Sequence, residues 1–307
     1  MTAKKTRLVY IAGYGRSGTT VLSMALGQHP AFFGAGEIVT LALHAWRNNE
    51  VCSCGTPIQD CAFWATVVER WQKDQSPSLI EEYRNLQKRI EPTISPARML
   101  NMVYGHEAFA AYARHTARLF DAIASVSGCA TIIDSSKSAG RALAFARNPE
   151  IELYVVHMVR DGRGVAWSLL QAHDRDVRAG IHEPLIPKPV LRTAARWGFV
   201  NLATEFLCWR LGPQRSMRIR YEDFTSNPTM IMQDIGRMLD LDLASIGEAL
   251  RDGTAIAPGH LIAGNRLRMK GALRLVQDSS WRADMPGHKQ RAFRWLCGGL
   301  LRRYGYS

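Results

Sequence analysis

The sequence predicts an α/β fold: a doubly wound parallel sheet, flanked by helices, that contains a phosphate-binding loop. Short apolar segments rich in β-branched residues alternate along the chain with segments of helical periodicity. A glycine-rich loop joins the first apolar segment to the first helical one. The 307 residues are 47% hydrophobic and contain no internal repeat, so one large core is the natural expectation. We therefore expect residues 1–307 to form a single domain.

Four segments have the length and composition of buried parallel strands: 8–12, 130–134, 153–159 and 217–221. Helical patterns lie between and around them, at 20–27, 38–46, 63–71, 79–90, 97–125, 139–148, 164–173, 190–211 and 229–239. The pair Asn227-Pro228 is a suitable N-cap and first-turn residue for the last of these helices. Segments 72–115 and 172–189 lie outside the loops considered below, and we expect them to be insertions on the side where an acceptor molecule binds.

The loop at residues 13–20 reads GYGRSGTT and has the GxxxxG spacing of a phosphate-binding loop. Backbone N–H groups of such a loop, together with the N-terminus of the helix that follows, favour a bound phosphate. Nucleoside triphosphatases have Lys and then Ser or Thr where this chain has Thr19 and Thr20, and here a cation, Arg16, lies inside the loop. The loop therefore predicts a nucleotide other than ATP or GTP.

Two further strands end in polar, basic sequences. The second strand runs into residues 134–137, DSSK, and the third into residues 160–163, RDGR. Ligands of doubly wound sheets bind at the carboxyl ends of the strands, where these three sequences should meet. Helical geometry lets Ser168 face the same crevice as Arg160, and a guanidinium with a hydroxyl suits a terminal phosphate. The three strand ends together predict a polyanionic ligand.

Asp134 supports a competing interpretation. At the end of an apolar strand it has the position of a metal-binding carboxylate in a kinase or another nucleoside triphosphatase with a degenerate loop. Lys137 beside it and Thr19 in the loop argue against that interpretation. A third alternative is a protein that keeps the fold and binds a nucleotide or polyanion but has lost catalytic activity.

The loop GRSGTT (15–20) and the segment RDGRGVAWS (160–168) together resemble the sulfotransferases that use 3′-phosphoadenosine 5′-phosphosulfate. The first is similar to the family's 5′-phosphosulfate loop, and the second to its 3′-phosphate motif. Weaker similarities are found in CSCGTPIQDCAFW (52–64), in RYEDFTSNP (220–228) and in residues 260–268. The form RSGTT is closer to the bacterial and tyrosylprotein-type branch than to the cytosolic small-molecule branch.

The resemblance implies in-line transfer of a sulfuryl group to an acceptor hydroxyl, without a required metal ion. It implies that the donor is bound by Gly15, Arg16, Ser17, Gly18, Thr19, Thr20, Arg160, Ser168, Tyr221, Gly264, Asn265 and Arg268. Glycan or glycolipid hydroxyls come first among the acceptors that the family suggests, then small metabolites, then protein tyrosines.

The resemblance also suggests catalytic residues. Arg16 and Lys137 are the expected cations that stabilise charge on the leaving oxygens, and Glu37 is the expected general base. The plain alternative for Glu37 is a carboxylate that stabilises the N-terminus of the helix predicted from residue 38. Other branches use His as the base, so His106 and His260 remain reserve candidates.

Charge also points to an acidic ligand, partner or surface, since the formal net charge is +12. Residues 251–307 contain 11 Lys or Arg and 3 Asp or Glu, so most of the excess lies there. No nucleic-acid-reading module accompanies it, and we expect no nucleic-acid partner.

The helical pattern at 288–304 is typical of a surface helix packed on the core; the alternative is a helix lying on an anionic membrane. With neither a leader nor a spanning segment, we expect a cytoplasmic protein, or one peripheral to the inner membrane surface.

Three of the six cysteines cluster in the sequence, as Cys52, Cys54 and Cys61. A local structural turn or a redox pair is the favoured interpretation, and no metal is expected. A zinc site would need a fourth ligand, for which His44 is only a weak candidate. Cys129, Cys208 and Cys297 are expected to be small core residues.

Overall fold

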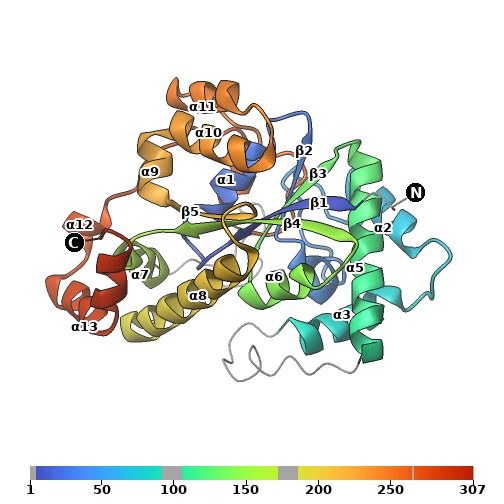
Figure 1. Ribbon diagram of the computed structural model, residues 1–307, viewed down its shortest axis with the longest axis horizontal. Coiled ribbons are helices and arrows are strands. Elements are labelled where there is room, and N and C mark those ends of the chain that lie inside the picture. Colours follow the sequence, from blue (N-terminus) through green and yellow to red (C-terminus); the bar gives the residue numbers. More distant parts are fainter. Residues whose placement is uncertain (1–4, 92–105, 172–185, 265, 307) are drawn as a thin grey trace.

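The computed structural model describes residues 5–91, 106–171, 186–264 and 266–306. Its centre is one five-stranded sheet in which every neighbouring pair of strands is parallel, in the order β2-β3-β1-β4-β5 (Figure 1). The strands are β1 (Thr6–Ala12), β2 (Phe32–Gly36), β3 (Thr131–Lys137), β4 (Ile151–Val159) and β5 (Ser216–Arg220). The chain adds strands on one side of β1 and then on the other, so the fold is the predicted doubly wound α/β sheet.

Helices cover both faces of this sheet. They are α1 (Thr19–Leu26), α2 (Ala62–Gln72), α3 (Leu79–Ile90), α5 (His106–Ser127), α6 (Ala139–Ala146), α7 (Gly162–Leu170), α8 (Val190–Leu211), α9 (Tyr221–Ser226), α10 (Pro228–Leu239), α11 (Ala244–Arg251), α12 (Trp281–Asp284) and α13 (Gly287–Arg303). A π-helical turn, η1 (Leu41–Ala45), and a 3₁₀ turn, η2 (Arg266–Met269), complete the regular elements. None of the helices described combines the length and the hydropathy that a membrane span requires.

The alternation of side chains along β1 divides the core in two. Leu8 and Tyr10 are buried on one face, among residues of α2, α3, α5 and α6. Val9 and Ile11 are buried on the other, against α1, α10 and α11. Figure 1 shows α1, α9, α10 and α11 above the sheet and α6, α7 and α8 below it. Because both faces of β1 are covered, its residues 8–12 are continuously apolar, as buried parallel strands require.

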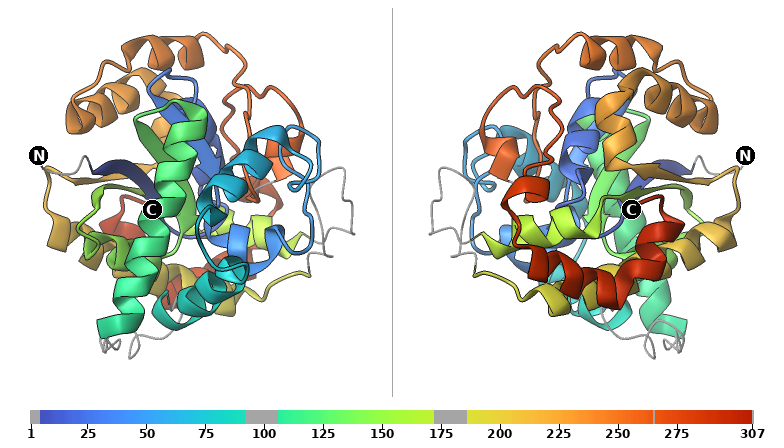
Figure 2. Two further views of the ribbon diagram at one scale, coloured as in Figure 1. Left: turned by 90° about the vertical axis from the view of Figure 1, so that its right-hand side faces the viewer. Right: turned by 90° about the vertical axis from the view of Figure 1, so that its left-hand side faces the viewer.

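The C-terminal helix α13 packs on α7 and α8, as the right-hand view of Figure 2 shows. Phe293 and Leu301 are buried there, and the ring of Phe293 lies edge-on to that of Trp197. Leu296 stays 45% exposed on the outer side. The helix therefore has the core-packed face that its periodicity predicts.

The structure adds one strand to the four predicted and changes one helix. β2 has the sequence FFGAG, whose two glycines weaken the strand pattern, and the sequence did not identify it. The helix predicted at 38–46 is present at residues 39–45, but Leu41–Ala45 form the π-helical turn η1. Part of the helix predicted at 97–125 lies outside the described residues, as does most of the segment 172–189. The Asn227 cap is confirmed: its side chain accepts a hydrogen bond from the N–H of Met230, and Pro228 opens α10.

Candidate active site

A cleft of about 710 Å³ lies at the carboxyl ends of the strands, where the segments after β1, β2, β3 and β4 meet. Residues 264–278 form another side of it. The residues that line it are Gly15, Arg16, Gly18, Thr19, Thr20, Val21, Glu37, Lys137, Arg160, Ser168, Lys188, Tyr221, Gly264, Leu267, Leu273, Arg274, Leu275, Val276 and Asp278. Five of these side chains are basic and two are acidic, so the cleft suits an anionic ligand.

The loop after β1 has the backbone of an anion-binding turn. Gly18 is the N-cap of α1 and has a φ of 88°, in the left-handed region that favours glycine. A Cβ atom on Gly18 would lie 2.6 Å from Cδ2 of Tyr221, so the aromatic ring closes against the loop. Thr19 and Thr20 open the helix, and no acidic side chain lies in its first turn. The N-terminus of α1 therefore faces the cleft as a partial positive charge.

Two arginines lie together over this loop. Arg160 Nη1 donates a hydrogen bond to the backbone oxygen of Arg16, 3.1 Å away. Burial lowers the pKa of Arg16, and the nearby Arg266 and Arg160 guanidiniums lower it further. Positive charges gathered in this way are stabilised by an anion between them.

Arg160 is nearly buried and held from several sides. Its Nη2 donates to the backbone oxygen and to Oδ2 of Asp278, both at 2.9 Å. Its guanidinium lies 4.6 Å from the ring centroid of Tyr221. Burial would raise the pKa of Asp278, but the hydrogen bonds from Arg160 and Ser280 lower it overall. The Nε atom of Arg160 is buried and has no hydrogen-bond partner among the described residues, so one donor of this side chain is left for a ligand.

Glu37 and Lys137 form an ion pair across two neighbouring strand ends. Glu37 follows β2, Lys137 ends β3, and the Lys137 ammonium donates to Oε1 of Glu37. The two side chains are 20% and 17% exposed, and both line the cleft. Lys137 has a φ of 70°, a left-handed conformation in which non-glycine residues are uncommon. A proton acceptor and a cation therefore lie in contact at the edge of the cleft.

Lys188, Arg274 and Asp278 were not among the residues identified from the sequence. Lys188 reaches the cleft from the segment before α8, where its N–H bonds the oxygen of Leu169. Burial lowers its pKa, and the nearby Arg196 lowers it further. Two sequence signals concerned these cations: the excess of basic residues, and for Lys188 the expectation that segment 172–189 lies on the acceptor side. No motif singled out the residues themselves.

Not every expected donor-binding residue lines the cleft. Ser17 is buried, and its hydroxyl has no hydrogen-bond partner among the described residues. Arg268 is buried behind the cleft wall and donates to the backbone oxygens of Gly264 and Val51, at 3.5 and 3.3 Å. Asn265 lies outside the described residues. Gly15, Arg16, Gly18, Thr19, Thr20, Arg160, Ser168, Tyr221 and Gly264 do line it.

Asp134 lies in the protein interior, where its carboxylate oxygens accept hydrogen bonds from other residues. It is fully buried; its Oδ1 accepts the N–H and hydroxyl of Ser136, and its Oδ2 accepts Nε of Arg141 at 3.1 Å. It is not among the residues that line the cleft. A carboxylate engaged in this way does not offer the open position that a nucleotide-bound Mg²⁺ needs.

His44 does not join the three clustered cysteines. Its Nδ1 lies 2.5 Å from Oε1 of Glu50, whereas the imidazole beside the thiols belongs to His260. The weak expectation that His44 would be a fourth ligand is therefore wrong. Because His260 faces the cysteines and is not among the residues lining the cleft, the geometry does not favour it as a catalytic base. The side chain of His106 lies outside the described ones.

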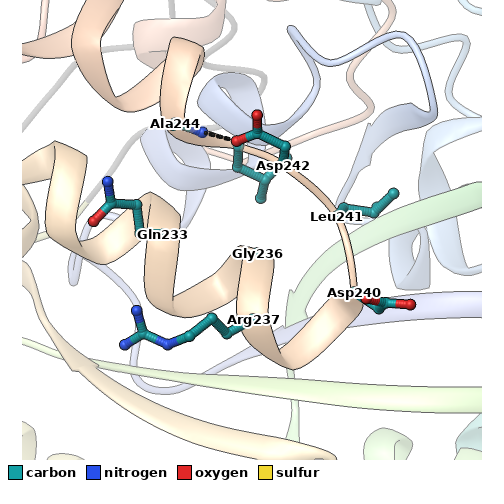
Figure 3. A pocket seen from close by; sticks show the side chains of 8 residues that line it. Gln233, Gly236, Arg237, Asp240, Leu241, Asp242 and Ala244 are labelled. Carbon is teal, nitrogen blue, oxygen red and sulfur yellow. Dashed lines mark hydrogen bonds between the residues drawn. The ribbon is translucent and has the colours of Figure 1, made fainter.

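A second hollow lies at the turn between α10 and α11 (Figure 3). Its volume is about 470 Å³, and Arg237, Asp240 and Leu241 are among its lining residues. It shares no lining residue with the cleft, and within it the side chain of Asp242 accepts a hydrogen bond from the N–H of Ala244, the first residue of α11. The side chains that line this hollow do not form a set that would bind one ligand.

Three solved structures share this architecture. The sulfotransferase domain of the Synechococcus PCC 7002 olefin synthase has a TM-score of 0.51 at 17% identity and covers 99% of this chain and 96% of its own. The sulfotransferase domain from the curacin biosynthetic pathway has a TM-score of 0.52 at 13% identity, covering 99% of both chains. The sulfotransferase STF9 from Mycobacterium avium has a TM-score of 0.51 at 15% identity and covers 99% of this chain and 78% of its own. At these identities the likeness shows the fold.

A comparison with curated protein sequences gives no significant match. A model of the sulfotransferase family matches residues 9–245, which span β1 to β5 and contain the loops after β1, β3 and β4. The match covers well over half of the chain. By this match the chain belongs to the sulfotransferase family.

Proposed function

We propose that this protein transfers the sulfuryl group of 3′-phosphoadenosine 5′-phosphosulfate to an acceptor hydroxyl. The observation that carries the proposal is the single cleft in which Arg16, Glu37, Lys137 and Arg160 come together from four strand ends. Family membership supports the transferase class, and the cleft supports the donor and the roles of these residues.

The residues of the cleft fit this donor. The N-terminus of α1 and Arg16 suit the 5′-phosphosulfate, and Arg160 with Ser168 suits the 3′-phosphate. The unpartnered Nε of Arg160 and the excess of basic over acidic side chains are what a polyanion would require. When bound, the donor supplies the activated sulfuryl group.

In this proposal Glu37 accepts the proton of the acceptor hydroxyl as the oxygen attacks. Lys137 and Arg16 stabilise the negative charge that develops on the oxygens of the leaving bisphosphate. Since Lys137 already touches Glu37, one contact aligns the base and a cation at the same edge of the cleft. Donor and acceptor oxygens can then be held in line without a metal ion.

The acceptor is proposed only by class. Leu273, Leu275 and Val276 give one side of the cleft an apolar wall, which suits an acceptor with an apolar body beside its hydroxyl. Among the acceptors that the family suggests, this wall favours a glycolipid hydroxyl; a glycan hydroxyl, a small metabolite and a protein tyrosine follow in that order.

Calorimetric titration tests the donor assignment directly. We expect adenosine 3′,5′-bisphosphate to bind without magnesium and far more tightly than AMP, because Arg160 recognises the 3′-phosphate. Arg160→Ala should weaken the bisphosphate by about 10- to 100-fold, the effect of losing a charged hydrogen bond, and leave AMP nearly unchanged.

Arg237→Ala is the matched control, since Arg237 is a 74% exposed arginine on α10 paired only with Asp234. It should leave both affinities unchanged. Magnesium-dependent binding of ATP with no preference for a 3′-phosphate would overturn the proposal and favour the kinase alternative. Tight bisphosphate binding without sulfuryl transfer to any acceptor tested would favour the non-catalytic binder.

A further inference from the structure

Four side chains that ligate soft metals converge away from the cleft. Cys52, Cys54 and Cys61 come from the loop before α2, and His260 comes from a segment some 200 residues later. The four ligand atoms all lie within 4.8 Å of one another. The sulfurs of Cys54 and Cys61 are 3.7 Å apart, and Nδ1 of His260 is 3.4 Å from Cys61 Sγ and 3.9 Å from Cys52 Sγ.

These separations match a tetrahedral zinc site. With Zn–S bonds of about 2.3 Å and Zn–N bonds of about 2.0 Å, a tetrahedron places two sulfurs about 3.8 Å apart and a sulfur and a nitrogen about 3.5 Å apart. A disulfide needs sulfurs about 2.05 Å apart, and all three cysteines are free thiols in the structure. The arrangement is therefore that of four ligands around one centre.

Backbone and side-chain contacts hold the ligands in place. The oxygen of Cys52 accepts the N–H of Gly55 at 2.9 Å, and its N–H donates to the oxygen of Thr56 at 2.9 Å, which folds the loop into a tight turn. Trp64 Nε1 donates to the backbone oxygen of His260 at 2.7 Å, and the His260 ring stacks on Phe63 at 5.3 Å. The ligands are thus oriented by contacts that do not involve a metal ion.

Ser53 lies between the first two cysteines, and its hydrogen bonds link the cysteine loop directly to the segment that contains His260. Its hydroxyl donates to the oxygen of Gly259 at 2.8 Å and accepts the N–H of Leu261 at 2.7 Å. Both residues that flank His260 are therefore fixed to the cysteine loop. Because these two segments are far apart in the sequence, the four ligands come together only in the folded protein.

We propose that Cys52, Cys54, Cys61 and His260 bind one structural zinc ion. Three thiolates and an imidazole are a soft donor set that selects zinc over magnesium or calcium. Four protein ligands fill the tetrahedron and leave no position for water or substrate, so the ion is structural and not catalytic. Here "zinc knuckle" means the loop 52–61 together with His260.

The zinc knuckle connects to the cleft through the two residues after His260. Ile262 N–H donates to the oxygen of Ala35 at 3.0 Å, and its own oxygen accepts the N–H of Glu37 at 2.8 Å. Gly36, between them, has a φ of 77°, and a Cβ atom there would lie 2.4 Å from the oxygen of Ile262. Zinc would therefore anchor the segment that fixes the backbone of Glu37.

Metal analysis of the full-length protein tests the proposal. We expect about one zinc per chain by inductively coupled plasma mass spectrometry, after purification without metal-affinity resin and dialysis against a weak chelator. Cys54→Ser and His260→Ala should each lose most of it. Cys129→Ser is the control, because this half-buried thiol lies outside the cluster, and it should retain the metal.

Cobalt substitution gives a second readout that does not depend on how the variants fold. The wild-type protein reconstituted with Co²⁺ should show the thiolate charge-transfer and intense d–d bands of a tetrahedral site. Absence of zinc from the wild-type protein together with absence of these bands would overturn the proposal, as would a Cys54–Cys61 disulfide found by mass spectrometry of freshly purified protein. Both readouts are independent of sulfuryl transfer, so they stand whether or not the proposed function does.

Discussion

The position of Glu37 is set by β2, a strand of only five residues. The carboxylate extends from the end of β2, the ammonium of Lys137 meets it from the end of β3, and the N–H of Glu37 is bonded to Ile262. Residues 39–45 after Glu37 are helical, as predicted, so the proposed role as a base is favoured by its contact with Lys137 at the edge of the cleft.

Glu37→Gln keeps the shape of this side chain and removes the proton acceptor. We expect turnover to fall by about 10²- to 10⁴-fold, the usual contribution of a general base, while affinity for adenosine 3′,5′-bisphosphate changes little. Steady-state rates beside calorimetry separate the two effects. Glu81→Gln, on the exposed face of α3, is the control and should have no effect. A variant that turned over at the wild-type rate would remove Glu37 from the mechanism.

His157 predicts a pH dependence of stability. Burial lowers its pKa to about 4, with its Nε2 bonded to Oδ1 of Asn201. The unfolded chain takes up a proton near pH 6.5 and the folded chain does not until about pH 4. Stability from this residue is therefore complete above pH 6.5 and is lost as the pH falls toward 4, by about 3 kcal/mol.

Chemical denaturation at several pH values measures this loss. His157→Gln, which can still donate to Asn201, should flatten the profile between pH 6.5 and 4. If the variant and the wild-type protein lost stability in parallel over this range, other groups would be responsible.

At the scale of elements, the sequence predicted those whose pattern is local. The apolar runs of β1, β3, β4 and β5 and the 22-residue helix α8 have unambiguous periodicity, and the loop after β1 has a fixed spacing of glycines. β2 was missed because the contacts that make it a strand are with β3, almost a hundred residues away. Lys188 and Asp278 were missed for the same reason: only the folded chain brings their segments to the strand ends.

Four elements meet in a buried ion-pair network below the sheet. Arg141 on α6 is fully buried and bonds Asp134 on β3 and Glu91 at the end of α3, while the hydroxyl of Tyr112 on α5 donates to Glu91 at 2.5 Å. Burial raises the pKa of Glu91, and the Arg141 guanidinium opposes that effect. The network joins the layer of helices to the strand that ends in Lys137.

Removing the shared cation should destabilise the fold strongly. Arg141→Met leaves two buried carboxylates without their partner, and we expect a loss of about 3–5 kcal/mol in the free energy of unfolding. Urea denaturation measures it. Arg251→Met is the control, because Arg251 at the end of α11 pairs with Asp252, both side chains are more than half exposed, and the loss should cost less than about 1 kcal/mol. Comparable losses for the two variants would show that the network adds nothing.

At the scale of the whole molecule, the net charge of +12 adds to the charge of a cleft in which basic lining residues outnumber acidic ones by five to two. A charged ligand is attracted from a distance by such a field, and salt screens it. Composition alone predicted an acidic ligand, but not its chemical class, because net charge carries no geometry.

We expect the affinity for adenosine 3′,5′-bisphosphate to fall by about tenfold between roughly 0.05 and 0.5 M salt, because the Debye length shortens to a few ångströms. Uncharged adenosine should change less than about twofold over the same range. Calorimetry at four salt concentrations measures both. Equal salt dependence for the two ligands would contradict a cleft that recognises phosphate charge.

The family match ends at residue 245, and yet the cleft is closed by residues beyond it. Gly264, Leu273, Arg274, Leu275, Val276 and Asp278 form one side, and Ile262 supports the backbone of Glu37. The loops after β1, β3 and β4 lie entirely within the matched part. A chimera that exchanges only residues 271–276 would therefore keep the nucleotide loops, His260, Gly264 and Asp278 and receive a new wall, which makes this short stretch the natural place to graft a different acceptor preference.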